Sequence, residues 1–186
     1  MIGSMPNVKH CFVLDGQIEG FEDWETVVSK MPSEKIADQC EGTAMLYSSG
    51  TTGYPKGVKR PLPEQEYGEE VAPNLMSVLY GAGESSIYLS PAPLYHAAPL
   101  AFTMSCLRMG VTVVVMQHFE AEYALQCIQD YRITHSQWVP TMFVRMLKLP
   151  EEVRAKYDVS SLQVAIHAAA PCPIPIKEQM ISWWGK

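Results

Sequence analysis

The chain of 186 residues is long enough for one domain with a sizeable core, and its 47% hydrophobic and 18% charged residues exclude a disordered protein. The net charge of −6, without a cluster of Lys and Arg, argues against general binding to nucleic acid, so any phosphate must be bound by a few local donors. No apolar run approaches the roughly 20 residues of a membrane span, and residues 1–8 lack the pattern of a signal peptide.

The cysteines are odd in number and scattered along the chain. They are Cys11, Cys40, Cys106, Cys127 and Cys172. Because no C-x-x-C pair occurs, neither a zinc site nor a disulfide framework is expected. Reduced thiols in a cytoplasmic protein are the simplest interpretation, and no metal site is assigned.

Residues 1–42 are predicted to form a strand and a linker that lead into the main domain. The apolar run at 11–14 predicts a strand, which the Asp-Gly pair at 15–16 ends. The polar stretch 17–39 predicts a linker that carries one short helix near residues 24–30.

Residues 43–186 are predicted to form the α/β portion of the chain. Strands are expected at 43–47, 87–89, 111–116, 134–139 and 162–166, and helices at 64–80 (started, kinked or broken by Pro73), 97–109, 120–132, 140–147 and 175–184. The β-branched run at 111–116 is typical of a strand that is covered on both faces. Since strand and helix alternate from residue 111 onward, the fold class is α/β, a parallel sheet flanked by helices.

A run of small and hydroxyl-bearing residues follows directly after the strand at 43–47. It comprises Ser48, Ser49, Gly50, Thr51, Thr52, Gly53 and Lys56. Glycines free the backbone, so that N–H groups, hydroxyls and the lysine can all surround a triphosphate or pyrophosphate. The run is not the P-loop of common NTPases, because Pro55 stands where that motif has its second Gly. An ordinary Ser/Gly-rich hairpin or linker is the alternative.

Three segments carry a specific resemblance, which covers nearly the whole chain. YSSGTTGYPKGV at 47–58 resembles the phosphate-binding signature of the adenylate-forming superfamily, which includes acyl-CoA synthetases, luciferase and the adenylation domains of peptide synthetases. PAPLYHAAPL at 91–100 and IHAAAPCP at 166–173 are similar to two further segments of that superfamily, and WVPTMF at 138–143 also looks like it. The resemblance is closest to fatty-acid–CoA ligases. It implies an incomplete, central piece of the large N-terminal domain.

The resemblance assigns roles to residues of this chain. It implies that the Ser48–Lys56 run binds the ATP phosphates, and that Tyr95 and His96 border the acyl and pantetheine channel. It implies that the backbone of Ala168, Ala169, Ala170 and Pro171 packs against adenine and the acyl group. Each assignment has a structural alternative. His96 can be a packing histidine, and small residues at a strand–helix junction let a helix approach a sheet closely.

The implied reaction uses a carboxylate, ATP, Mg²⁺ and coenzyme A. The carboxylate attacks the α-phosphate to give an acyl-adenylate and pyrophosphate, and the CoA thiol then displaces AMP. The family's Tyr-Gly-x-Thr-Glu segment, its ribose-binding Asp and its C-terminal catalytic Lys have no counterpart here, so no catalytic residue is assigned. We therefore expect a little-active piece of a longer enzyme that self-associates through uncovered strand edges and apolar faces.

Two other functions fit the sequence less well. One is an adenylation domain that loads a carrier protein, although the His96 segment favours the CoA branch. The other is a nucleotide-binding or scaffold domain without catalysis. His10, His118 and His135 show no partner in the sequence, and Trp183 and Trp184 are expected to pack a helix.

Overall fold

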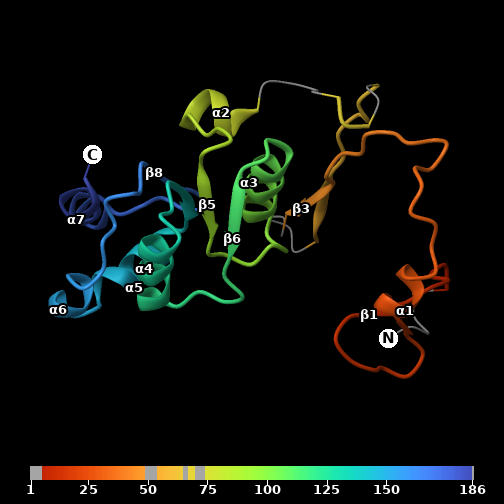
Figure 1. Cartoon of the computed structure of the whole chain (residues 1–186), viewed down its shortest axis with the longest axis horizontal. Coiled ribbons are helices and arrows are strands. Elements are labelled where there is room, and N and C mark those ends of the chain that lie inside the picture. Colours follow the sequence, from red (N-terminus) through yellow and green to blue (C-terminus); the bar gives the residue numbers. More distant parts are fainter. Residues whose placement is uncertain (1–5, 49–53, 65–66, 70–73, 186) are drawn as a thin grey trace. The chain divides into compact units, whose positions relative to one another are not determined.

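The structure is a computed structural model that describes residues 6–48, 54–64, 67–69 and 74–185 (Figure 1). The chain divides into two compact units, one formed by Met1–Thr43 with Pro61–Glu69 and the other by Ala44–Arg60 with Glu70–Lys186. Among the described residues, no helix has both the length and the apolar character needed to cross a bilayer.

Within its described residues, the first unit holds three short elements. Strand β1 (Phe12–Val13) pairs in parallel with β2 (Glu22–Asp23), and helix α1 (Trp24–Val28) follows directly. The carboxylate of Asp23 caps this helix by accepting a hydrogen bond of 2.8 Å from the N–H of Thr26. The strand and the short helix predicted near these positions are therefore present, whereas β2 was not predicted.

The second unit is built around a parallel four-stranded sheet in the order β6-β5-β7-β8. Its strands are β5 (Ile87–Ser90), β6 (Thr112–Val115), β7 (His135–Trp138) and β8 (Val164–His167). Its helices are α2 (Leu75–Tyr80), α3 (Ala97–Arg108), α4 (Ala121–Asp130), α5 (Pro140–Leu147), α6 (Glu151–Arg154) and α7 (Ile174–Trp184). The predicted α/β class, with helices around a parallel sheet, is confirmed.

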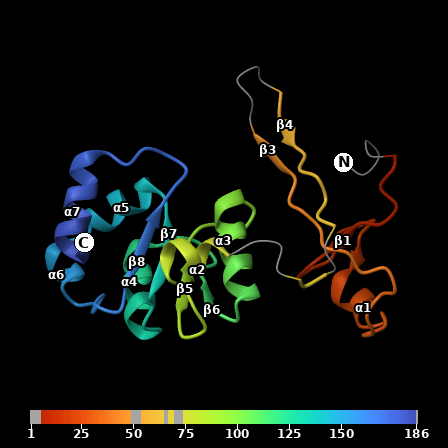
Figure 2. The same ribbon diagram turned by 90° about the horizontal axis from the view of Figure 1, so that it is seen from above.

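Helices lie on both faces of this sheet (Figure 2), and an apolar cluster of side chains fills the space at each face. The larger cluster joins α4, α5 and α7 to one face and contains Leu89, Trp138 and Phe143. The smaller cluster joins α2 and α3 to the other face and contains Tyr88 and Ile166. Neighbouring residues of a strand point to opposite faces, so β5 contributes Tyr88 to one core and Leu89 to the other.

The predicted helix at 64–80 is wrong in its first part. Residues 65–66 and 70–73 lie outside the described residues, and 67–69 form a turn rather than a helix. Gly68 has a φ of +89°, a left-handed conformation that a right-handed helix cannot include. The helix begins only after Asn74, whose Oδ1 accepts a hydrogen bond of 2.9 Å from the N–H of Met76.

The strand predicted at 111–116 is covered on both faces in its middle, since Val113 packs against the smaller cluster and Val114 against the larger. Its place at an edge of the sheet was not predicted. Strand β6 is the first in the sheet order, and Val115 is 50% exposed. An apolar, β-branched run fixes the preference for a strand but not its place in the sheet, which depends on pairing with distant residues. The strand predicted at 43–47 also lies later in the chain, as β3 (Leu46–Ser48), and both β4 (Lys56–Val58) and α6 were missed.

His135 lies inside the sheet and is 1% exposed. Its Nε2 lies 2.9 Å from the carbonyl oxygen of Tyr80, so this nitrogen carries the proton and donates it. Its Nδ1 lies 2.8 Å from Oγ1 of Thr134. The ring thus joins the end of α2 to the centre of the sheet, a contact that the sequence did not reveal.

Replacing His135 by leucine is expected to lower the free energy of unfolding by about 1–3 kcal/mol, because the carbonyl of Tyr80 loses its buried donor. Urea unfolding followed by circular dichroism measures this loss. The control is His118→Leu at an exposed position, where the change should stay within about 0.5 kcal/mol. Equal stability of the two variants would contradict the prediction.

Asp158 stabilises the turn before β8 through three donors. The hydroxyl and the N–H of Ser160 and then the guanidinium of Arg132 lower the pKa of this carboxyl from 3.8 to about 2. The Arg132 Nη1 to Asp158 Oδ2 distance is 2.8 Å, and both side chains are more than half exposed. The turn is therefore held by hydrogen bonds that need an ionised carboxylate.

The folded protein binds a proton at Asp158 less readily than the unfolded chain does, so stability from this group is complete above about pH 4 and is lost as the pH falls toward 2. We expect Asp158→Asn to be less stable than the wild type at pH 7, with the difference shrinking between pH 4 and pH 2. Urea midpoints at pH 7, 4 and 2.5 test this. A difference that is independent of pH would contradict it.

Candidate functional site

The strand order places a topological switch point between β5 and β7. From β5 the chain passes through α3 to β6 on one side, whereas from β7 it passes through α5 and α6 to β8 on the other. In open parallel sheets, ligands bind in the crevice outside the carboxyl ends of the two strands at such a point. The residues that follow Ser90 and Trp138 are therefore the first candidates for a site.

The segment after β5 carries the predicted channel residues Tyr95 and His96. Their rings lie 4.5 Å apart between centroids at an angle of 46°. The side chain of Tyr95 is 83% exposed, and His96 is the N-cap residue of α3 but makes no capping hydrogen bond through its side chain. Both rings are thus exposed at the carboxyl edge of the sheet.

The turn after β8 carries the predicted residues Ala168, Ala169, Ala170 and Pro171. The N–H of Ala168 donates a hydrogen bond of 3.0 Å to the carbonyl of Trp138, which fixes this turn to the end of β7. Ala169 has a φ of +72°, a left-handed conformation that costs a residue with a Cβ about 1 kcal/mol or more. Such strain is frequent at ligand-binding turns.

Tyr95, His96 and the alanine turn therefore lie along the same edge of one sheet. Strands β5 and β8 flank β7, so their carboxyl ends are two strand spacings, or about 10 Å, apart. This separation suits a ligand of the size of an acylated nucleotide. The roles assigned to these residues stay predictions.

The predicted phosphate run lies within the hairpin of β3 and β4. These strands are antiparallel, and Ser48 is the register partner of Lys56. Ser49, Gly50, Thr51, Thr52 and Gly53 lie outside the described residues. Lys56 is exposed. A Cβ at Gly57 would come within 2.6 Å of Cε of Met45, which is the end of a flexible side chain that can move aside.

Sequence reasoning missed a set of buried polar side chains at the carboxyl edge. Oγ1 of Thr103 donates to Oγ of Ser90 over 3.1 Å, and Nε2 of Gln137 donates to the carbonyl of Trp138 over 2.9 Å. The available signal was the polar run His135-Ser136-Gln137, which makes up most of β7 (His135–Trp138). All three of its residues are buried.

Cys106 is buried on the face of the sheet that α2 and α3 cover. Burial raises the pKa of its thiol to about 11. Burial and the neighbouring Cys106 likewise raise the pKa of the Tyr88 phenol. Both groups stay protonated at neutral pH, so neither serves as a nucleophile there.

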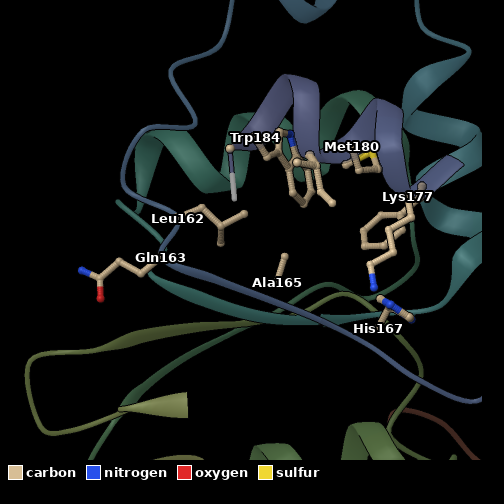
Figure 3. Close-up of a pocket in the computed structure, with 10 residues that line it drawn as sticks. Leu162, Gln163, Ala165, His167, Lys177, Met180 and Trp184 are labelled. Carbon is tan, nitrogen blue, oxygen red and sulfur yellow. The ribbon is translucent and has the colours of Figure 1, made fainter. Parts of the chain in front are cut away.

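A pocket of about 190 Å³ lies between β8 and α7, on the opposite face of the sheet from α3 (Figure 3). Leu162, Ala165, Met180 and Trp184 give it an apolar lining. Lys177 extends from α7 toward the His167 ring at one end of the pocket (Figure 3). Within the described ranges, no group of His, Cys, Asp and Glu side chains could hold a metal ion.

Known proteins are similar in amino-acid sequence to most of this chain. The chain is 36% identical over 151 residues to 4-coumarate–CoA ligase 2 of Petroselinum crispum, an alignment that covers 77% of this chain and 26% of the ligase. The chain thus spans about a quarter of the length of this relative.

Solved structures of other proteins have a fold similar to that of this chain. The O-succinylbenzoate coenzyme A synthetase of Bacillus subtilis, solved in complex with AMP, matches with a TM-score of 0.65 and 26% identity over 92% of this chain and 45% of the synthetase. A putative long-chain-fatty-acid CoA ligase of Rhodopseudomonas palustris has a TM-score of 0.72 at 19% identity, over 98% and 43% of the two chains, which shows the shared fold alone.

The family described as AMP-binding enzyme matches residues 3–186, the same stretch that contains the hairpin, the Tyr95–His96 segment and the alanine turn. The solved structures named above resemble this chain in fold, and the relative aligned by sequence is named as a CoA ligase. The chain belongs to the family of AMP-binding, adenylate-forming enzymes.

Proposed function

We propose that the protein to which this chain contributes is an AMP-forming acid–thiol ligase that joins a hydrophobic carboxylic acid to coenzyme A at the expense of ATP. The observation that carries the proposal is the 36% identity to a 4-coumarate–CoA ligase over 151 residues. The exposed Tyr95–His96 pair at the carboxyl edge supports the CoA branch. Fatty acids are one class of hydrophobic acid to test, beside aromatic acids of the kind named in the relatives.

Each part of the site has a role in this proposal. Lys56 and the backbone and hydroxyl groups of 48–53 hold the β- and γ-phosphates while the carboxylate attacks the α-phosphate. The alanine turn packs against adenine and the acyl group, and His96 borders the path of the CoA thiol. These contributions are positioning and charge stabilisation rather than covalent chemistry.

The described residues contain no group of three or more His, Cys, Asp and Glu side chains that could hold a metal ion, so any Mg²⁺ would enter with the phosphates of ATP. No step is therefore assigned to the ion in this chain. We infer that the 186 residues alone turn over little or no substrate, since they correspond to 26% of the length of the relative. Free cysteines in the described part of the chain are consistent with the cytoplasmic location that we propose.

The test is ATP–pyrophosphate exchange by the product of the complete gene, with a panel of fatty and aromatic carboxylic acids. We expect exchange that depends on the acid, followed by thioester formation when CoA is added. Acid-dependent exchange without transfer to CoA would favour a carrier-protein-loading enzyme. Absence of exchange with every acid would reject the ligase in favour of a non-catalytic domain.

The isolated chain is expected to self-associate. Helix α2 exposes Leu75, Val78 and Leu79 by 63–64%, and α3 exposes Met104 and Leu107 by 49% and 53%. Exposed apolar side chains of this kind are removed from water by association. Light scattering over a range of concentrations should show a rising mean mass, and a constant monomer mass at the highest concentration would contradict this.

A further inference from the structure

A second hollow lies on the surface of the second unit, between α6 and the last turns of α5 and α7. Its volume is about 450 Å³, which is within the range of about 300–1,000 Å³ that small-molecule sites occupy. Leu147 and Trp183 contribute apolar lining, and α6 contributes Glu151 and Arg154. This hollow is named the α6 pocket, after the helix that carries its two charges.

Arg154 brings a positive charge to the α6 pocket that the described residues leave without a partner. Its guanidinium carbon lies 5.0 Å from the centroid of the Trp183 ring, so the indole covers one side of the group. Its Nε is buried and has no hydrogen-bond partner among the described residues, and no ion pair between them includes Arg154. A carboxylate supplied by a ligand would stabilise this partly buried cation.

Glu151 brings the one negative charge of the lining. It lies three residues before Arg154 in α6, so the two side chains are neighbours on one face of that helical turn, although they are not within ion-pairing distance of each other. The other polar side chains of the lining, Gln179 and Ser182, are uncharged. One acid beside one base disfavours a phosphate and favours a ligand that itself carries one negative and one positive group.

The α6 pocket lies at the amino edge of the sheet. Helices α5 and α7 start at the carboxyl ends of β7 and β8 and run back along the sheet, so their last turns, with Leu147 and Trp183, lie at the other edge. Tyr95, His96 and the alanine turn are at the carboxyl edge. The α6 pocket is therefore separate from the groups to which the reaction is assigned.

We propose that the α6 pocket binds a free α-amino acid with a large apolar side chain. The carboxylate of the ligand bonds to Arg154 and its ammonium group to Glu151, while its side chain packs against Trp183. The two charged groups of an α-amino acid are joined through a single carbon, which suits partners that are neighbours on one helical turn. The inference goes beyond the proposed ligase function and does not depend on it.

The experiment measures binding of L-phenylalanine to the product of the complete gene by saturation-transfer-difference NMR. We expect a dissociation constant on the order of 1 mM for a ligand with about a dozen non-hydrogen atoms. N-acetyl-L-phenylalanine lacks the ammonium charge and L-phenylalaninamide lacks the carboxylate. Each should bind about tenfold more weakly, because one of the two charge-assisted contacts is lost.

The variants Arg154→Gln and Glu151→Gln should each weaken binding of L-phenylalanine about tenfold. Arg145→Gln is the matched control, because Arg145 also lies over an aromatic ring, at 4.7 Å from the centroid of Phe119, but does not line the α6 pocket. It should bind L-phenylalanine as the wild type does. If Arg154→Gln does not fold, Glu151→Gln still decides, since it changes an exposed side chain.

Three results would overturn the inference. The first is absence of binding at about 10 mM L-phenylalanine, which would mean that the charges of Glu151 and Arg154 are satisfied by solvent and by each other. The second is unchanged binding in Glu151→Gln, or an equal loss in Arg145→Gln. The third is displacement of L-phenylalanine by the carboxylic acids that support ATP–pyrophosphate exchange, which would place the ligand at the carboxyl edge. The exchange rates themselves decide only the ligase proposal.

Discussion

Replacing Trp138 by alanine is expected to lower the free energy of unfolding by about 3–5 kcal/mol. The indole is fully buried at the end of β7, and its ring centroid lies 6.3 Å from Phe119, 6.2 Å from Phe143 and 5.6 Å from Trp184. One substitution thus opens a cavity where the sheet, α5 and α7 meet. Aromatic pairs of this geometry add to the loss from burial alone.

Urea unfolding followed by far-ultraviolet circular dichroism measures this effect without relying on tryptophan fluorescence. Trp138→Phe should cost less than half as much, because it keeps a ring and removes an indole N–H that has no partner among the described residues. Tyr95→Ala, at an 83% exposed ring, is the control and should change stability by no more than about 0.5 kcal/mol. A loss below about 1 kcal/mol for Trp138→Ala would show that this junction is not the centre of the core.

Replacing Lys56 by alanine is expected to reduce kcat for acid-dependent ATP–pyrophosphate exchange about 10²-fold in the product of the complete gene. The reason is the loss of a cationic donor to the phosphates, on which negative charge shifts as pyrophosphate leaves. Lys56 begins β4 opposite Ser48, so the strand pairing places it at the base of the phosphate run.

Lys59→Ala is the matched control, because Lys59 has the same charge, is also exposed and lies three residues further along the chain. It should change the exchange rate by less than about twofold. An equal loss in both variants would indicate a general effect of charge on ATP binding. A Lys56→Ala protein of near wild-type activity would remove Lys56 from the site.

Much of the local structure could be predicted from the residues themselves. The helix expected at 140–147 is observed as Pro140–Leu147, because Pro140 suits the first helical position and apolar residues follow at helical spacing. The end of α3 was also predictable, since Gly110, with a φ of +72°, follows its last turn. The family was indicated by the Ser48–Lys56 run, whose residue types and spacing are specific enough without any tertiary contact.

The site could be predicted only in part. Tyr95, His96 and the alanine turn were identified by resemblance, and the sheet brings them to one edge. Gln137 and His135 were missed, because a polar residue within a strand gives no sign of whether water or a helix covers it. Whether such a residue is covered depends on strands and helices more than ten residues away. Thr134 is an example, since its Oγ1 accepts a hydrogen bond of 2.9 Å from the N–H of Ile87.

The sequence by itself determined the class of fold, the positions of most helices and strands, and the family to which the chain belongs. These follow from local backbone preferences, from the spacing of apolar residues and from one short motif. Only the tertiary structure decided the strand order β6-β5-β7-β8, which leaves β6 at an edge of the sheet and sets Ser90 beside Gln137. The physical reason is that pairing of parallel strands depends on contacts between distant segments, which no local pattern encodes.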